Sequence, residues 1–157
     1  MELQEKKKNR TEQKTDMQNK EKALLTQLDE IAKQDLCLAF SGGVDSSLLL
    51  KLVMDASAKY GTKVYAVTFQ TRLHPPCDLE TATRVAKEVG AVHEVLFVDE
   101  LEQEAIRYNP ENRCYLCKHY LFGKLLEFAR DHGVTQVLDG TNAVSYTHLR
   151  AHETRSN

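Results

Sequence analysis

The stretch "CLAFSGGVDSSLLLKLV", Cys37 to Val53, decides the fold. A short apolar run predicts a buried β-strand, and the longer apolar run after Asp45 predicts a helix. Glycine permits positive φ and lets a ligand approach the backbone closely. The start of the following helix offers unpaired N–H groups and partial positive charge. The polar residues between strand and helix therefore predict an anion site suited to phosphate.

Two familiar phosphate-binding patterns do not fit this loop. It has neither the lysine nor the spacing of G-x-x-x-x-G-K-[ST], and it is not G-x-G-x-x-G. Transfer of a γ-phosphoryl group and dinucleotide redox chemistry are therefore not favoured. The plain structural alternative is a tight turn into a helix that is capped by Ser41 or Asp45.

Strands and helices are predicted to alternate along the rest of the chain. Apolar periodicity predicts helices at 23–33, 44–59, 79–89, 100–107 and 115–132, and strands at 36–40, 63–69, 93–98 and 135–139. This alternation indicates an α/β fold, a parallel sheet with right-handed crossovers flanked by helices. Ligands bind such sheets at the carboxyl ends of the strands, where the strand order reverses. We expect residues 41–47 and 140–142 to meet there.

Two of these helices are predicted to present an apolar face to the core. In the lead-in helix the face is Leu24, Leu25, Leu28 and Ile31. In the last helix the inward residues are expected to be Leu121, Phe122, Leu125, Leu126 and Ala129.

Composition is ordinary for one globular domain. The 157 residues are 41% apolar and 28% charged, and the net charge is −2. This charge disfavours a nucleic-acid partner. No apolar run reaches the roughly 18 residues of a membrane span. Four cysteines without an apolar leader indicate free thiols and a cytoplasmic chain. The oligomeric state stays open, a homo-oligomer included.

The two ends of the chain differ from its middle. Residues 1–22 are polar and predict a solvated extension, helical or disordered, with a partner-binding arm as the alternative. We assign 23–143 to the domain that carries the phosphate loop. Residues 144–157 are polar and aperiodic, and we expect them not to be native sequence. His148, His152 and Glu153 are not predicted to bind metal, because their segment has no amphipathic pattern.

The string "SGGVDSS", between a buried strand and a buried helix, resembles the loop of the PP-loop (N-type) ATP pyrophosphatases. This resemblance implies a Rossmann-like nucleotide α-hydrolase fold, with ATP as substrate and Mg²⁺ as cofactor. The loop would hold the β- and γ-phosphates while a substrate oxygen attacks the α-phosphate and pyrophosphate leaves. Asp45 would order the loop or touch the metal. The alternative is a plain carboxylate at the start of a helix.

Three further stretches narrow the resemblance. "HPPCDLETATRVAKEVGAVHEVL", "NPENRCYLCKHYLF" and "LDGTNA" resemble segments of the ATP-dependent sacrificial sulfur transferases of nickel-pincer cofactor maturation. These enzymes adenylate a carboxylate on a pyridinium mononucleotide, and a protein cysteine then gives up its sulfur. The resemblance runs from about Leu24 to Ala143 and implies a fold incomplete at its C-terminus, without the donor cysteine. The alternatives are a tRNA-thiolating or amide-forming relative, similar to GMP or NAD synthetase, and a nucleotide-binding fragment without turnover.

The same resemblance implies roles for individual residues. Thr68 would lie near adenine, and Arg113 would pair with phosphate or carboxylate. Asp45 and Arg113 are the catalytic candidates. Residues that would flank the nucleotide from the fourth strand are Gly140 and Thr141. Residues that would hold the phosphates are Ser41, Gly42, Gly43, Val44, Asp45, Ser46 and Ser47.

The cysteines are compatible with more than one functional hypothesis. Cys114-x-x-Cys117 has the spacing of half a metal site. Cys37 and Cys77 do not form a second pair, and Cys37 is predicted to be a core residue. A closed zinc site is therefore not expected. Redox or Fe–S thiols and a structural role at a helix start remain open, and the structural role is favoured.

Overall fold

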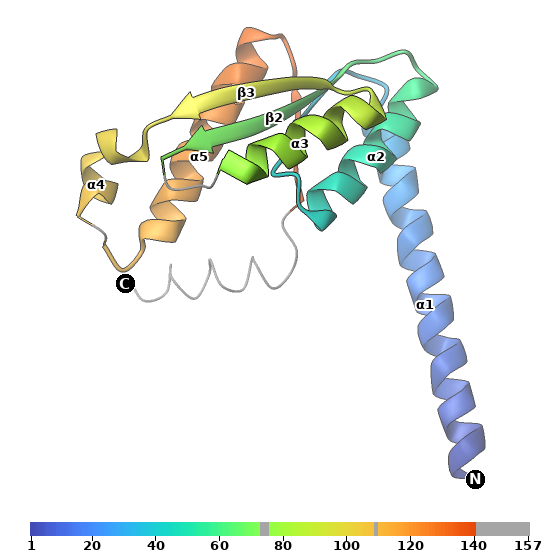
Figure 1. The fold of residues 1–157 in the computed structure, drawn as a ribbon. Coiled ribbons are helices and arrows are strands. Elements are labelled where there is room, and N and C mark those ends of the chain that lie inside the picture. The colour runs from blue at the N-terminus through green and yellow to red at the C-terminus, as the bar shows by residue number, and fades with distance from the viewer. Residues whose placement is uncertain (73–75, 109, 141–157) are drawn as a thin grey trace.

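The computed structural model describes residues 1–72, 76–108 and 110–140. Four parallel strands form one sheet with the order β3-β2-β1-β4. The strands are β1 Leu36–Ala39, β2 Val64–Thr71, β3 Val92–Val98 and β4 Gln136–Asp139. This sheet and its flanking helices confirm the predicted α/β class (Figure 1).

The helices also follow the predicted order, with shifted ends. The bounds are α1 Glu2–Ile31, α2 Val44–Ala58, α3 Pro76–Val89, α4 Glu104–Arg107 and α5 Arg113–Asp131, and a single 3-10 turn η1 spans Glu100–Glu102. Strand β2 runs to Thr71 and so takes in two residues that were expected in a loop. Pairing with β3 extends it, because Gln70 and Thr71 lie opposite Phe97 and Val98. No helix of the described residues combines the length and the apolar character that crossing a membrane requires.

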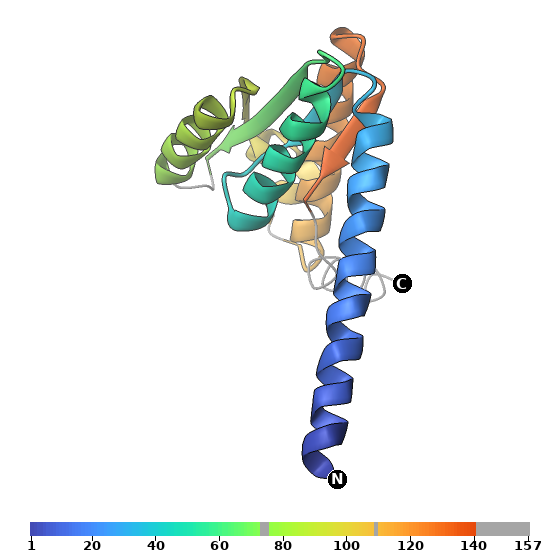
Figure 2. The ribbon, with the colours of Figure 1, turned by 90° about the vertical axis from the view of Figure 1, so that its right-hand side faces the viewer.

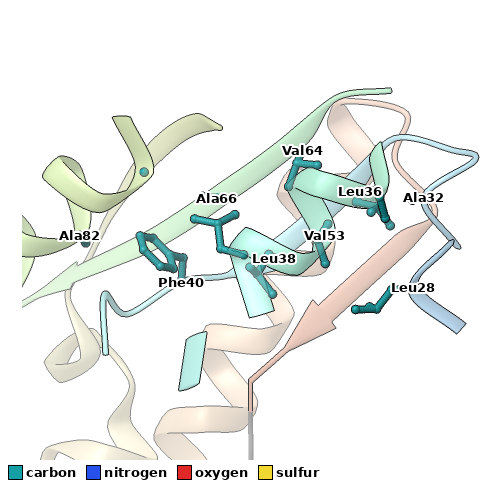
Figure 3. Packing of buried hydrophobic residues seen from close by; sticks show 12 residues of the cluster. Leu28, Ala32, Leu36, Leu38, Phe40, Val53, Val64, Ala66 and Ala82 are labelled. Carbon is teal, nitrogen blue, oxygen red and sulfur yellow. The ribbon is translucent and has the colours of Figure 1, made fainter. Parts of the chain in front are cut away.

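The sheet is covered on both faces, and each face has its own core. On one face, residues of α1, α2 and α3 pack on side chains of β1 and β2 that include Leu36, Leu38 and Ala66 (Figure 3). On the other face, α5 packs on Cys37 and Val67. Neighbouring residues of β1 thus serve opposite cores, as expected for a strand buried on both sides. Cys37 is fully buried, and burial raises its thiol pKa to about 11, which confirms the predicted core role.

One predicted inward residue of α5 is wrong. Leu126 is 51% exposed, whereas Leu125, Phe128 and Ala129 are buried. The reason is helical geometry. The buried residues follow Leu125 at spacings of three and four, whereas Leu126 lies about 100° further around the helix. Sequence alone does not locate the edge of such a stripe when two leucines are adjacent.

Helix α1 is one continuous element of 30 residues, in which the polar extension and the expected lead-in helix merge. Figure 2 shows it extending away from the sheet. Residues 1–27 are all exposed, including Leu24 and Leu25 of the expected apolar face, and Leu28 is its first buried side chain. Near its C-terminus, Asp29 accepts hydrogen bonds from Lys59 Nζ at 2.9 Å and Tyr60 Oη at 2.7 Å. These contacts hold the last turns of α1 against the end of α2.

The topology places a strand-order reversal beside β1. From β1 the chain proceeds to β2 and then β3 on one side, whereas β4 pairs with β1 on its other side. The crossovers through α2 and α3 cover one face, and the crossover through α5 covers the opposite face. The carboxyl ends of β1 and β4 therefore lie side by side at this reversal. A crevice at this position is where open α/β sheets bind ligands.

Candidate functional site

A cavity of about 400 Å³ lies at the carboxyl ends of β1, β2 and β4. Its size falls in the usual range of small-molecule sites, about 300–1,000 Å³. Residues of the loop after β1, the ends of β2 and β4, the first turn of α3 and one side of α5 line it. Of the predicted site residues, those lining the cavity are Ser41, Gly43, Val44, Asp45, Ser46, Thr68 and Gly140.

Other predicted site residues lie elsewhere. Gly42 shapes the loop from behind, and Ser47 has a buried hydroxyl without a hydrogen-bond partner among the described residues. Arg113 starts α5 outside the cavity lining. Thr141 lies outside the described residues. The phosphate, adenine and catalytic roles expected of all these residues stay predictions.

Gly42 is the position where the loop requires glycine. Its φ is +80°, a conformation that side-chain-bearing residues rarely adopt. A Cβ added there would lie 2.9 Å from both Cα and N of Ala82 in α3. The loop therefore turns tightly against the backbone of α3, and Ala82 is fully buried. This close approach explains why the turn begins with glycine.

Hydrogen bonds within the loop form a closed ring. The Gly43 N–H donates to Ser41 Oγ at 3.3 Å, and Ser41 Oγ lies 3.0 Å from Ser46 Oγ. Ser46 Oγ in turn donates to the Gly43 carbonyl at 3.3 Å. A single arrangement of hydroxyl hydrogens satisfies all three contacts when Ser41 donates to Ser46. The ring fixes the loop shape before any ligand binds, which favours binding because less order is lost.

Helix α2 begins at a residue that cannot cap it. Gly43 is its N-cap residue and makes no side-chain cap hydrogen bond. In the plain structural alternative Ser41 or Asp45 would cap the helix, but the N-cap residue is Gly43, and the Ser41 hydroxyl contacts Ser46 and Gly43. The first-turn N–H groups have no partner inside the helix and carry the positive end of its dipole. These N–H groups require a hydrogen-bond acceptor, and an anion in the adjacent cavity would be one.

Thr68 connects β2 to the start of the loop. Its side chain is buried, and Oγ1 donates to the Phe40 carbonyl at 2.8 Å. The same oxygen lies 2.8 Å from His93 Nε2 of β3. The Phe40 N–H also bonds the Val67 carbonyl at 2.8 Å. Thr68 therefore holds the last residue before Ser41 in place, a role that the sequence did not indicate.

Replacing Thr68 by valine tests this anchor. Valine has nearly the same shape but leaves the Phe40 carbonyl and His93 without the hydroxyl. We expect a loss of about 1–3 kcal/mol in the free energy of unfolding, the usual effect of leaving a buried polar group unpaired. Urea denaturation followed by circular dichroism measures it. Thr135→Val is the control, because its hydroxyl bonds Gln34 at an exposed site and its loss should change stability little.

His93 should make stability depend on pH. Burial lowers the pKa of His93 from 6.5, and the Glu94 carboxylate opposes this effect less strongly. The folded state therefore favours the neutral ring. Its contribution is fully present above about pH 6.5 and is lost as pH falls from there toward the lower pKa of the folded protein. The urea midpoint should drop between pH 7.5 and 5.5, and by less in His93→Gln. An equal drop in both proteins would contradict the assignment.

Gly140, the residue after β4, packs closely against the loop that follows β1. A Cβ at Gly140 would lie 3.2 Å from Ser46 Cα and 3.3 Å from Ser46 N. The residue after β4 thus packs against the start of α2, with Asp139 and Gly140 both lining the cavity. The predicted meeting of the two loops is confirmed for Gly140. Thr141 and Asn142 lie outside the described residues.

The charged lining of the cavity combines three carboxylates with one ammonium group. Asp45, Asp78 and Asp139 come from α2, α3 and β4, and Lys118 comes from α5. The sequence pointed to Lys118 only as the last residue of the Arg113–Lys118 string. Its position one turn after Cys114 was the available signal, because residues four apart share a helix face. Among the described residues, no group of three or more potential metal ligands is close enough to hold an ion.

The pair Cys114 and Cys117 lies at the start of α5 in two different environments. Cys114 is exposed. Cys117 Sγ donates a hydrogen bond of 2.6 Å to Oε1 of Glu100, a residue that is 1% exposed. Burial and the Glu100 carboxyl raise the pKa of Cys117 to about 12, although the Arg113 charge opposes them. Cys117 is therefore protonated at neutral pH.

Sequence comparison shows which family the chain belongs to. Residues 13–113 match the PP-loop domain family, and they include the loop after β1. The chain belongs to the PP-loop family. One relative is an uncharacterised protein of Synechocystis sp., 37% identical over 105 residues, which are 67% of this chain and 38% of that protein. Another is pyridinium-3,5-bisthiocarboxylic acid mononucleotide synthase of Lactiplantibacillus plantarum, 32% identical over 107 residues, 68% of this chain and 38% of the synthase.

Solved structures of other proteins share the fold. The U34-tRNA thiolase NcsA of Methanococcus maripaludis has a TM-score of 0.63 at 12% identity, over 84% of this chain and 50% of the thiolase. The NH3-dependent NAD synthetase of Campylobacter jejuni has a TM-score of 0.58 at 17% identity, over 77% of this chain and 56% of that chain. The PP-loop chain described here thus spans well under two thirds of the sequence relatives it matches.

Proposed function

We propose that this PP-loop chain binds ATP in the cavity and adenylates a substrate carboxylate with release of pyrophosphate, as the first half of a sulfur transfer. The observation that carries the proposal is the start of α2 at Gly43, which makes no side-chain cap, beside a loop already ordered by its own hydroxyls. Such a start binds anions through backbone N–H groups. The match to a PP-loop family supports ATP as the anion.

The chain's own groups suit a departing pyrophosphate. The N–H groups of the first turn of α2 would bind the β- and γ-phosphates from one side, and Lys118 of α5 would approach from another. Negative charge grows on pyrophosphate as the bond to the α-phosphate breaks. Donors that are already in position stabilise this charge without having to reorganise. Thr68 contributes by holding Phe40, and thus the loop, in place.

Mg²⁺ fits the cavity as an ion shared with ATP. Asp45, Asp78 and Asp139 line the cavity, and hard cations prefer oxygen ligands such as carboxylates. Mg²⁺ is commonly bound by one or two carboxylates together with substrate phosphates, which agrees with the lack of a complete protein site among the described residues. We propose that Asp45 contacts the ion. When bound, Mg²⁺ would neutralise charge on the leaving pyrophosphate.

The substrate is proposed to be a carboxylated pyridinium mononucleotide. The support is the similarity to a synthase named for such a compound, together with the "NRCYLCK" string. Arg113 would bind its phosphate or carboxylate, since a guanidinium group pairs well with either. We keep the expectation of a cytoplasmic location, because the proposed reaction consumes ATP.

An isotope-exchange assay tests the function. The full chain is incubated with ATP, Mg²⁺, labelled pyrophosphate and a pyridinium-carboxylate mononucleotide, and label entering ATP is counted. Exchange that requires the mononucleotide would support the proposal. Exchange driven by tRNA, or by a carboxylate with ammonia, would replace it with a thiolating or amide-forming reaction. ATP binding without any exchange would reduce the chain to a nucleotide-binding fragment.

Asp45→Asn tests the proposed contact with Mg²⁺. The amide keeps an oxygen but loses the charge, so we expect the Mg²⁺ concentration for half-maximal exchange to rise about 10-fold. The saturating rate should fall less. Asp55→Asn, at an exposed ion pair with Lys51 in the same helix, is the control and should leave the Mg²⁺ dependence unchanged. An unchanged dependence of exchange on Mg²⁺ in Asp45→Asn would show that Asp45 does not contact the ion.

A further inference from the structure

The two cysteines of α5 and the carboxyl group of Glu100 form a second chemical site outside the cavity lining. Cys114 is exposed in the first turn, and Cys117 is half-buried one turn later. Glu100 belongs to η1, a separate element, yet its Oε1 accepts the Cys117 thiol hydrogen at 2.6 Å. The side chain of Glu100 is 1% exposed, and its other oxygen Oε2 is buried without a hydrogen-bond partner among the described residues.

The burial of a carboxyl group next to a thiol requires an explanation. Burying a polar group with an unpaired oxygen is costly, and a purely structural site would favour an apolar residue or a second donor. A carboxyl group at this distance can accept the thiol proton and return it. The arrangement of one exposed thiol, one protonated thiol and a buried proton acceptor suits a dithiol that reacts in two steps.

We propose that Cys114 and Cys117 reduce disulfides by thiol–disulfide exchange, with Cys114 as the entering thiol, Cys117 as the resolving thiol and Glu100 as the base for Cys117. This activity goes beyond the adenylation proposed above and needs no ATP. The substrate class is an accessible disulfide of a small molecule or an extended peptide, because Cys114 alone is exposed at this helix start.

The two steps balance. Cys114 Sγ attacks one sulfur of the substrate disulfide and forms a mixed disulfide, and the first substrate thiol leaves with the Cys114 proton. Cys117 then transfers its proton to Glu100 Oε1, and its sulfur attacks Cys114 Sγ. The second substrate thiolate leaves and takes that proton. The protein has lost two electrons and two protons, and the substrate disulfide has gained them.

Helix geometry permits the product. Residues three apart in an α-helix have Cα atoms about 5 Å apart. Disulfides span Cα separations of about 4.4–6.8 Å. Cys114 also precedes Lys118 and Leu121 by four and seven residues, so these three share one face of α5. Because Lys118 and Leu121 line the cavity, the entering thiol is placed next to its α5 wall.

Oxidised glutathione is the probe, and ATP is omitted so that failure of the adenylation proposal cannot affect the result. The full chain is incubated with it, quenched with an alkylating agent and analysed by peptide mass spectrometry. We expect a product two hydrogens lighter, with the bond mapped to Cys114–Cys117. A lasting glutathione adduct on Cys114, a bond to any other cysteine, or no reaction would overturn the proposal.

Variants separate the three roles. Cys114→Ser should leave Cys117 without a glutathione adduct, whereas Cys117→Ser should accumulate the adduct on Cys114. Glu100→Gln keeps the shape but not the base, and its Cys114 adduct should persist at least about 10-fold longer than in the wild type. Glu127→Gln, at an exposed site of α5, is the matched control. Resolution by Glu100→Gln at the wild-type rate would show that Glu100 is not the base. A glutathione adduct that forms on Cys117 of Cys114→Ser as fast as the wild type reacts would show that Cys114 is not the entering thiol.

Discussion

Replacing Gly42 by alanine is expected to cost more than any other single change in the phosphate loop. The alanine would have to adopt φ near +80° and would place its Cβ 2.9 Å from backbone atoms of Ala82. A left-handed conformation costs roughly 1–2 kcal/mol for a side-chain-bearing residue. Overpacking against a rigid backbone adds about 1–3 kcal/mol. The loop must therefore shift away from α3, and with it the start of α2.

We expect Gly42→Ala to lower ATP–pyrophosphate exchange by about 100-fold or more, because backbone donors must match the phosphate positions closely. Urea denaturation and titration with ATP measure the two effects separately. Gly61→Ala is the matched control, since Gly61 has φ +66° but no atom within 4 Å of an added Cβ. It should show the conformational cost alone and keep full exchange. Wild-type ATP affinity in Gly42→Ala would show that the loop does not hold the phosphates.

Lys118 should carry the second largest effect. It is the one basic residue among the described residues that line the cavity, which three aspartates also line. Removing its charge with Lys118→Met keeps the length of the side chain and leaves a bound polyphosphate without that partner. Hydrogen bonds to charged groups contribute about 1.5–3 kcal/mol. We therefore expect ATP affinity to fall about 10- to 100-fold, with a weaker dependence of affinity on salt concentration.

Lys124→Met is the control for Lys118. It lies on the same helix but pairs with Glu127 at the surface, at 3.7 Å. Its loss should change ATP affinity little, because exposed ion pairs contribute about 0–1 kcal/mol and neither partner lines the cavity. If both variants lost affinity equally, general electrostatic attraction would explain the result, and Lys118 would have no specific contact.

Local sequence signals predicted much of the fold. The order of strands and helices followed from apolar runs and from breaks at glycine, because burial and backbone freedom act on neighbouring residues. The sequence predicted less well which apolar residues of α1 and α5 would be buried. Leu24, Leu25 and Leu126 are apolar but exposed, since the distance of each helix from the sheet decides which of its faces is covered.

Parts of the site could not be predicted in the same way. The role of Thr68 depends on Phe40 and His93, which are 28 and 25 residues away in the chain. The contact between Glu100 and Cys117 joins two elements 17 residues apart. Neither pair has a sequence pattern, because side chains meet there only after the strands have paired and α5 has crossed the sheet.

The sequence by itself determined the glycine turn between a strand and a helix, and it predicts an anion site there, since backbone conformation and helix polarity are local properties. It also determined the α/β class through alternating periodicity. Tertiary structure alone decided that Gly140 would close on Ser46, that Lys118 would reach the same cavity, and that Glu100 would meet Cys117. Those outcomes depend on strand order and helix crossover, which bring distant residues together.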